Sequence, residues 1–520
     1  MKRLKPDADQ CISFDSYVQW VRNYETEQAL IATSRLSHAM ELNDPRLKRS
    51  IFKKPDVGQW QLAHFAKTLI EASNDYRQDQ IQEEELYLAC NYHNHIRGPD
   101  DAGNIEGRRG VLNNLIRISY SQFPFQMQNH KADIPRALIL FEELAAQAID
   151  EFDVDSAFRK LTGLSIREFI LHGFAIWAIC GNGEIPPVKE STDPRTERLL
   201  PLEKQQKFRD IITADYMQFR ECQAKKPIKK GLEKQQFNCL HTYPLIRTQK
   251  SRKLVCPVPL LLIRRVTRGV YYQLQDAYSR GGRRNEFTQF FGKRLFEPYV
   301  GMHLRALATT AELIPEQDIG SEKTCDWILV EGESLTLIEC KALGLTFKSK
   351  ALAETDDVAD DLSKRIVKAV KACERTRQAI QEGLVGLAHL KGKTTRNLIV
   401  FYDDIFLFNS PLYRELIESE LQANGLGAVP FQVCAIRELE YAVPLLQNSG
   451  LGNFLDQKLA DRDHATWDIG TLLGRLIEDG ALKTNGPNKI LAEKLDSLFA
   501  ELTAQPNHLA SSDARLGESS

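Results

Sequence analysis

The sequence predicts a mixed α/β domain, whose sheet is flanked by helices, behind a large and mostly helical N-terminal region. Two observations predict this fold class. Over residues 1–180, apolar side chains recur at the three- and four-residue spacing of amphipathic helices. Over residues 285–445, helical runs alternate with short apolar runs bounded by turn residues, which is typical of a sheet built from helix–strand units.

Composition indicates an ordinary globular chain that is long enough for several domains. It has 520 residues, of which 42% are hydrophobic and 27% are charged. The sequence has no long apolar run, and no apolar segment follows its basic first residues. We therefore expect no membrane span, no secretory signal and a cytoplasmic protein. The ten cysteines include no CxxC pair, which indicates reduced thiols rather than a disulfide framework or a zinc site.

The N-terminal half is predicted to divide into three parts. Residues 1–180 are expected to form a helical domain, in which Ser165 is placed to cap a helix over 164–179. Residues 181–201 are rich in Gly, Pro, Ser and Thr and are expected to form a linker. Residues 202–284 are expected to form a basic intermediate region.

The balanced total charge hides a strongly basic segment. The whole chain has a formal net charge of -2, but residues 223–294 contain 17 basic and 3 acidic residues. This segment therefore carries +14, and the remainder of the chain carries -16. Binding to a phosphate backbone requires such a local basic surface, because each neutralised phosphate releases a counterion. The alternative is a solvated basic face, or pairing with the acidic remainder.

The α/β domain, 285–445, is predicted from its elements in order. Helix, strand, strand, helix, strand, helix and strand are expected at 285–307, 326–330, 335–342, 362–384, 397–402, 411–424 and 431–436. A turn at 331–334 joins the first two strands into a hairpin. The run 397–402 (NLIVFY) is apolar throughout, as in a strand that is buried on both faces. Residues 446–504 are predicted to be helical, and the polar residues 505–520 to be a disordered tail.

Asp326, Glu339 and Lys341 form a constellation with metal-site spacing. Strand side chains alternate between faces, so Glu339 and Lys341 point to the same side, and Asp326 begins the neighbouring strand of the hairpin. Two carboxylates and an ammonium therefore converge. Mg²⁺ binds through carboxylates together with water and phosphate oxygens. Glu339-Cys340-Lys341 is the only Glu-x-Lys triplet in the chain. The alternative interpretation is an exposed salt bridge at a strand end.

This constellation resembles that of the PD-(D/E)XK nuclease superfamily, which includes restriction endonucleases and the Mrr-like enzymes. The resemblance covers about residues 285–441 and implies a restriction-endonuclease-like core. It also implies that Asp326, Glu339 and Lys341 are catalytic and that the two acids bind Mg²⁺ or Mn²⁺. No resemblance is found for residues 1–200.

The resemblance extends to the flanking helices. In such nucleases the upstream helix often carries an acid in a Gly-x-x-x-Phe-Glu context, and Glu297 ends the matching stretch GKRLFE. Glu297 is therefore expected to be a further catalytic and metal-binding residue. Pro298 should kink this helix, so Glu286 is the reserve candidate. Gln378 on the long helix is a further supporting candidate, and Cys325 replaces the proline of the family's name.

The resemblance implies a metal-dependent endonuclease that acts on DNA more readily than on RNA and serves a bacterial restriction or anti-phage system. We expect a homodimer or a larger complex, and a protein partner for the helical N-terminal region. Two alternatives stay open. One is a non-catalytic nucleic-acid-binding or assembly subunit with a nuclease-like fold, and the other is a recombination or transposition subunit that cuts only in a complex. The residues expected to bind the nucleic acid are Arg264, Arg265, Arg268, Arg280, Arg283, Arg284, Lys293 and Arg294.

Histidines outside this constellation are expected to be structural. The run Tyr92-His93-Asn94-His95 resembles part of an HNH nuclease motif, but its surroundings look helical and contain no strand pair. A role at a helix end or in a loop is therefore expected. For His241 and His303 the sequence shows no partner, and both are expected to be structural.

Overall fold

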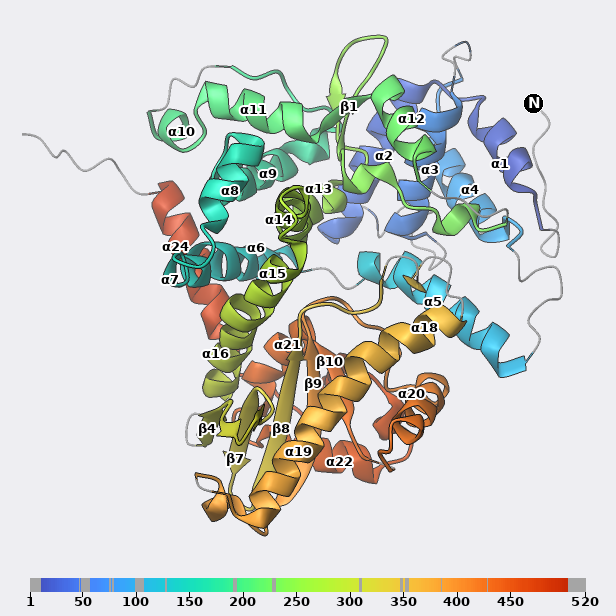
Figure 1. Cartoon of the computed structure of the whole chain (residues 1–520). Coiled ribbons are helices and arrows are strands. Elements are labelled where there is room, and N and C mark those ends of the chain that lie inside the picture. The colour runs from blue at the N-terminus through green and yellow to red at the C-terminus, as the bar shows by residue number, and fades with distance from the viewer. Residues whose placement is uncertain are drawn as a thin grey trace, which may run out of the picture.

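A group of helices lies above an α/β unit in this protein (Figure 1). The computed structural model describes residues 11–45, 47, 57–73, 76, 79–98, 107–126, 129–189, 194–226, 231–307, 311–346, 349–350, 355–384, 386–427 and 429–503. The predicted mixed α/β class, with helices flanking the sheet and a mostly helical N-terminal region, is confirmed. The predicted disorder of residues 505–520 lies outside the described residues.

A five-stranded mixed sheet, in the order β10-β9-β8-β7-β4, forms the centre of the α/β unit. β4 (Glu312–Pro315), β7 (Trp327–Glu331) and β8 (Ser334–Lys341) are antiparallel neighbours. β9 (Thr394–Phe401) and β10 (Gln432–Ala435) continue the sheet in parallel with β8. The side chains of β8 and β9 are buried almost without interruption, because helices cover both faces of the sheet.

One face of the sheet packs on the helix that precedes it and on C-terminal helices. These are α15 (Arg284–Phe290), the π-helical turn η8 (Phe291–Phe296), α16 (Glu297–Leu307), α21 (Ile436–Leu446) and α22 (Leu451–Ala460). Trp327, Leu329 and Ile338 point to this face and belong to the largest core. Further helices, α23 (Ile469–Glu478) and α24 (Lys489–Thr503), pack against the same core.

The long connection between β8 and β9 covers the opposite face. It consists of α18 (Thr355–Leu362), η9 (Ser363–Val367) and α19 (Lys368–Glu382), and α20 (Pro411–Ala423) joins β9 to β10. Ile328 and Leu337 contact this layer, in which Cys373 of α19 is buried. Every predicted strand and helix of this unit is therefore present. The sequence pattern did not indicate β4, because this edge strand is short, partly exposed and ends in a proline.

The helices that precede the α/β unit match the predicted helical character. They are α1 (Phe14–Val21), α2 (Thr26–Glu41), α3 (Gln59–Ala72), α4 (Glu83–His95), α5 (Gly107–Gln126), α6 (His130–Leu138), η4 (Ile139–Leu144), α7 (Ala145–Gln147), α8 (Val154–Thr162), α9 (Ile166–Ile179), α10 (Pro194–Leu199), α11 (Leu202–Ile212), α12 (Tyr216–Ala224), α13 (Pro259–Val266) and α14 (Arg268–Arg280). The Ser165 side chain caps α9, as predicted, and Glu168 completes a reciprocal capping box.

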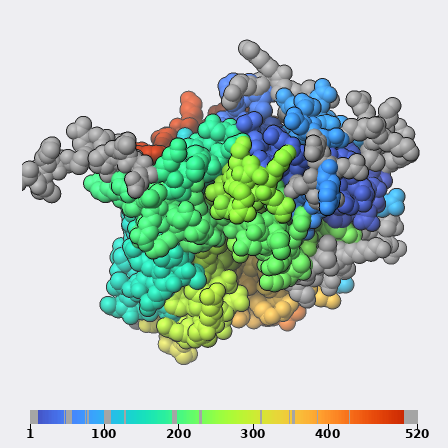
Figure 2. Space-filling view, turned by 90° about the horizontal axis from the view of Figure 1, so that it is seen from above, coloured from blue at the N-terminus to red at the C-terminus, as the bar shows by residue number. Residues whose placement is uncertain are grey.

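The hydrophobic cores divide the chain at other places than the predicted domain boundaries. One core joins α1–α4 to α12 and to part of 239–261, while the largest core joins α6–α9 to α13–α16 and to the sheet. The segment 202–284 contributes to both, and from above its green surface adjoins the blue N-terminal helices (Figure 2). In the expected linker, Ile185 is buried and pairs with Leu254.

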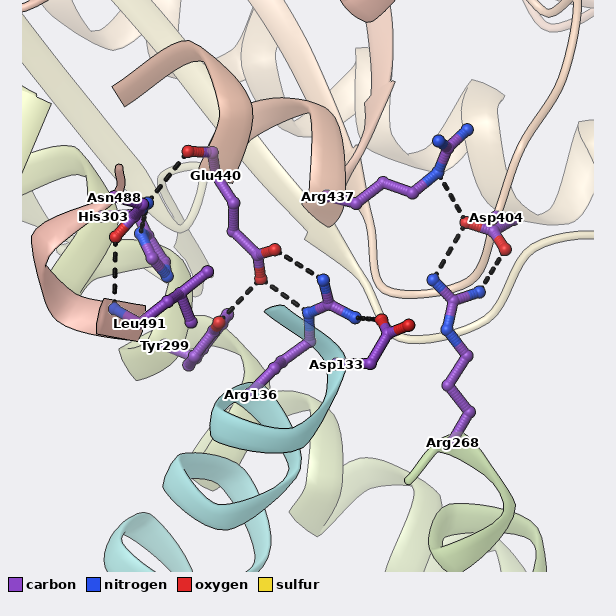
Figure 3. Close-up of polar contacts among 10 residues, drawn as sticks. All are labelled: Asp133, Arg136, Arg268, Tyr299, His303, Asp404, Arg437, Glu440, Asn488 and Leu491. Carbon is purple, nitrogen blue, oxygen red and sulfur yellow. Dashed lines mark hydrogen bonds and ion pairs between the residues drawn. The ribbon is translucent and has the colours of Figure 1, made fainter. Parts of the chain in front are cut away.

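A buried ionic network ties α6 to the α/β unit (Figure 3). The Arg136 guanidinium donates to Glu440 of α21 at 2.6 and 2.5 Å and to Asp133 at 2.5 Å. The Tyr299 hydroxyl of α16 donates to the same Glu440 carboxylate at 2.6 Å. Removing one partner from such a buried pair typically costs about 3–5 kcal/mol. The network therefore fixes the helices against the sheet.

Two further predictions concern cysteines and membranes. Cys222 and Cys239 form a disulfide, so the expectation of reduced thiols throughout is wrong at this pair, and the other eight cysteines are free. Tertiary packing alone brings α12 to the turn at Cys239–His241, and no sequence motif marks the pair. Among the described residues, no single helix is both long and apolar enough to cross a membrane, and the one helix pair that passes together bends by 56°.

Candidate active site

The candidate active site lies at the end of the β7–β8 hairpin opposite its turn. Trp327 pairs with Ile338 in the antiparallel register, which places Asp326, directly before β7, beside Glu339 of β8. The backbone N–H of Cys340 donates to Asp326 Oδ2 at 2.7 Å. Asp326 is 8% exposed and Glu339 is 9% exposed. The structure thus brings the two predicted carboxylates together in a buried position.

Lys341 adjoins the same carboxylates. Its Nζ donates to Glu339 Oε1 at 2.6 Å, and 26% of the lysine side chain is exposed. The two residues lie two positions apart on one strand and therefore emerge on the same face. Cys340 between them is buried in the core on the other face. Asp326, Glu339 and Lys341 form one cluster that is accessible from solvent through the lysine.

A further carboxylate reaches the cluster from the preceding helix. Lys293 Nζ lies 2.8 Å from Glu297 Oε2 and 3.8 Å from Asp326 Oδ1, so it links the two acids. The same ammonium lies 2.7 Å from Glu316 Oε2. The structure therefore brings Glu297 to the edge of the site. Sequence reasoning missed Glu316, because it follows the unrecognised strand β4.

The π-helical turn explains how Glu297 reaches the site despite Pro298. A proline has no N–H to donate and clashes with the preceding turn of an α-helix. The helix widens to the π form over Phe291–Phe296, directly before Glu297, and then continues to Leu307. Single π turns inside helices occur frequently at functional sites. The expected kink is therefore a local widening, and the helix does not end there.

Burial and mutual repulsion raise the pKa values of the clustered carboxyls. Desolvation, followed by the charge of Asp326, raises the pKa of Glu339 to about 7 and that of Glu297 to about 8. Burial also raises the pKa of Asp326. Burial by itself would lower the pKa of Lys341, but the Glu339 carboxylate outweighs it and raises that pKa. The site therefore holds more buried negative charge than its lysines compensate.

These residues suit a hard divalent cation. Mg²⁺ binds through one or two carboxylates and keeps several waters, and Asp326 and Glu339 offer such oxygens side by side. A cation would offset the repulsion between them. Within the described ranges, no three His, Cys, Asp or Glu side chains already surround one point. Lys293 stands between Glu297 and Asp326, and its side chain is 43% exposed, so it has room to withdraw when a cation binds.

The two supporting candidates lie away from this cluster. Gln378 is on the exposed side of α19 and donates to a residue of its own helix. Glu286 is exposed and pairs with a neighbouring arginine. Thr376, two residues before Gln378 on α19, lies closer, because its Oγ1 accepts the backbone N–H of Cys325 at 2.7 Å. This bond fixes the chain directly before Asp326, and a single threonine within a helix gives no sequence signal.

Three of the predicted nucleic-acid-binding arginines, Arg264, Arg265 and Arg268, are half-buried. Arg268 donates to Asp404, Arg437 donates to the same carboxylate at 2.8 Å, and Arg264 lies 3.7 Å from it (Figure 3 shows the first two pairs). The arginines outweigh burial and hold the pKa of Asp404 well below its usual value. Burial lowers the pKa of Arg265 to about 10. Arg264 and Arg268 therefore hold Asp404, and none of the three belongs to an exposed phosphate-binding surface.

The other predicted basic residues follow the helix that leads to the site. Arg280, Arg283, Arg284 and Arg294 are exposed, and Lys293 belongs to the cluster itself. Arg283 pairs with Glu286 and covers the Phe152 ring, while Arg294 pairs with Glu151. Arg284 begins α15 nine residues before Lys293, a distance of about 14 Å along a helix. The exposed basic ridge therefore consists of Arg280, Arg283, Arg284, Lys293 and Arg294, fewer residues than were predicted to bind the nucleic acid.

Comparisons of the chain with protein-family models, with curated proteins and with solved structures found no match.

Proposed function

We propose that this protein is a metal-dependent nuclease of the PD-(D/E)XK type. The observation that carries the proposal is the cluster of Asp326, Glu339 and Lys341 at the open end of one hairpin. A solvent-exposed salt bridge at a strand end would explain the motif without chemistry. That alternative is disfavoured, because Asp326 and Glu339 are only 8% and 9% exposed, and buried charges carry a large desolvation cost.

The order of elements supports a restriction-endonuclease-like core. A helix precedes an antiparallel run of three strands, β4, β7 and β8, and a long helix then returns the chain to the parallel strand β9. In this arrangement the site residues lie on the central part of the sheet and on the helix before it. The family resemblance implies a helix, a hairpin, a long helix and further strands, and β4 adds one strand to that order.

The chemistry of the proposed reaction divides among the clustered side chains. Asp326 and Glu339 would hold Mg²⁺ or Mn²⁺, with Glu297 assisting after Lys293 withdraws. The bound ion supplies polarisation of the phosphoryl oxygen and a lower pKa for an attacking water. Lys341 would orient that water and stabilise negative charge on the phosphate. The Cys340 N–H keeps Asp326 in position.

The proposed substrate is DNA in preference to RNA, held on the ridge that ends at Lys293 and Arg294. Cleavage of both strands with one site per chain favours a homodimer or a larger complex. A cytoplasmic role in bacterial restriction or anti-phage defence follows by analogy with the superfamily. The helical N-terminal region would then bind a regulatory partner.

Cleavage assays with the purified full-length chain test this proposal. Plasmid DNA, linear DNA and RNA are incubated with Mg²⁺, with Mn²⁺ or with EDTA, beside Asp326→Ala and the matched variant Asp360→Ala. Asp360 is exposed on α18 and pairs with Lys364. We expect cleavage of DNA with either metal, its loss in EDTA and in Asp326→Ala, and its retention in Asp360→Ala. If wild type cuts no substrate better than Asp326→Ala, the proposal of a nuclease that is active by itself fails. A non-catalytic subunit, or a subunit that cuts only in a complex, then replaces it.

A further inference from the structure

A pocket of about 340 Å³ lies within the helical region, away from the carboxylate cluster. Residues of α3, α4 and α5 line it, together with the segment 234–241 and Arg264 of α13. Its volume falls within the range of small-molecule sites. Figure 1 shows α5 between the upper helices and α18 and α20. The pocket is therefore a candidate ligand site in the helical region, beside the helix that adjoins the α/β unit.

The lining of this pocket is positively charged. Lys67, Lys234 and Arg264 contribute to it, and none of the described lining residues is Asp or Glu. The Lys67 side chain is 1% exposed, donates to Gln236 at 2.7 Å and pairs with Glu71 Oε2 at 3.9 Å. Arg264 shares Asp404 with two other arginines, so one carboxylate faces three guanidinium groups. The described lining thus carries three cationic side chains and no carboxylate, which suits an anionic ligand.

A buried polar atom of the lining has no partner. His93 lies at the end of α4, as predicted for the His-rich run, and it is 5% exposed. Its Nδ1 makes no hydrogen bond within the described chain, which is costly in a buried position unless a ligand or water satisfies it. Burial and then the charges of Lys234 and Lys67 lower the pKa of His93 to about 3. The ring is therefore neutral and offers one donor and one acceptor.

Planar rings and amides complete the lining. His241 packs between two lining phenylalanines, with ring centroids 6.3 Å from Phe125 and 5.6 Å from Phe237. Burial, followed by the charge of Arg264, lowers the pKa of His241 to about 3, so this ring is neutral too. Amide side chains such as Asn94 and Gln122 also line the pocket. Flat rings suit a heterocycle, amides suit its polar edge, and the cations suit phosphate.

We propose that this pocket binds a nucleotide, with its phosphates near Lys67, Lys234 and Arg264 and its base among the rings. The proposal is independent of the nuclease proposal, because the pocket and the carboxylate cluster share no residue. Such a ligand would contact elements of the helical region that themselves pack against the α/β unit. Leu112 and Ile116 of α5 pack with α18 and α20 in one core, and Arg264 contacts Asp404 in the loop after β9.

Binding to the full-length chain in EDTA tests the proposal, because no metal then bridges phosphates to the carboxylate cluster. Ribonucleoside monophosphates and triphosphates, tripolyphosphate and adenosine are compared by thermal shift and titration calorimetry. We expect at least one nucleotide to raise Tm and to bind more tightly than both tripolyphosphate and adenosine. The proposal is overturned if no nucleotide binds at millimolar concentration, or if tripolyphosphate binds as tightly as the best nucleotide.

Variants locate the binding. Lys234→Gln and His93→Phe should each weaken the best nucleotide about tenfold, equivalent to about 1.4 kcal/mol. The matched control is Lys207→Gln, an exposed lysine of α11 that pairs with Glu203, and it should bind within about twofold of wild type. Far-ultraviolet circular dichroism confirms that each variant is folded. Unchanged affinity in both pocket variants would show that the nucleotide binds elsewhere.

Discussion

Replacement of Asp404 by asparagine should destabilise the whole protein. Asp404 accepts from Arg268 and Arg437 and lies 3.7 Å from Arg264, so the substitution leaves three guanidinium groups without their shared carboxylate. Removal of one partner from a buried ion pair costs about 3–5 kcal/mol. The unfolding entropy is about 2.1 cal/mol/K per residue. For a chain of 520 residues that unfolds as one unit, the loss corresponds to about 3–5 °C in Tm.

Thermal unfolding of matched variants measures this loss. Asp360→Asn removes an exposed carboxylate from a helix of the same unit and should leave Tm within about 1 °C of wild type, because exposed ion pairs contribute little. Arg268→Met added to Asp404→Asn should restore part of the loss, because it removes one uncompensated charge. An unchanged Tm in Asp404→Asn would refute the structural role of these arginines. So would an Arg268→Met variant that binds DNA more weakly and yet keeps the wild-type Tm.

Three further predictions concern the site, the basic ridge and the disulfide. The pKa of Glu339 is raised to about 7, so its contribution to stability is present below about pH 4.5 and is lost as the pH rises through 7. In EDTA, Tm of Glu339→Gln should therefore rise relative to wild type between about pH 5 and about pH 8, whereas the exposed control Glu312→Gln should show no such trend. Alanine substitution of the ridge should weaken DNA binding and reduce the slope of log K against log salt concentration by about one per lost phosphate contact. Titrations at several salt concentrations measure this slope, and a slope equal to that of wild type would exclude the ridge as the binding surface. That variant combines Arg280→Ala, Arg283→Ala and Arg284→Ala. Cys222→Ser should lower the unfolding free energy by about 3 kcal/mol relative to oxidised wild type, because the disulfide closes a loop with a sequence separation of 17. Equal unfolding free energies of reduced and oxidised wild type would contradict this prediction.

Much of the α/β unit could be predicted, because its local patterns agree with its tertiary structure. The run 397–402 is apolar because β9 is buried on both faces, and two apolar runs joined by a turn predict the hairpin around Glu331–Ser334. The strand period alone placed Glu339 and Lys341 on one face. The same reasoning could not find β4, whose four residues form a partly exposed edge with no apolar period.

The charge count failed where burial decides the role of a residue. Arg264 and Arg280 contribute equally to a net charge, but the first shares Asp404 inside the protein and the second is exposed on the last turn of α14. Residue spacing on a helix cannot tell which cation meets a distant carboxylate, since Asp404 lies more than a hundred residues later in the chain. His93 was likewise expected to be structural, and only the tertiary structure shows its unpartnered nitrogen in a cationic pocket.

In the proposed nuclease, Lys341 acts on bound nucleic acid at the carboxylate cluster. Separate measurement of DNA binding and DNA cleavage by Lys341→Met tests this role most directly. Methionine keeps much of the side-chain volume and removes the charge. With Ca²⁺ in place of Mg²⁺, the variant should bind DNA within about threefold of wild type, because the exposed arginines remain. With Mg²⁺, its single-turnover cleavage rate should fall by at least about 100-fold, the usual cost of losing one group that stabilises transition-state charge. Cleavage at the wild-type rate by Lys341→Met would contradict the proposed nuclease site.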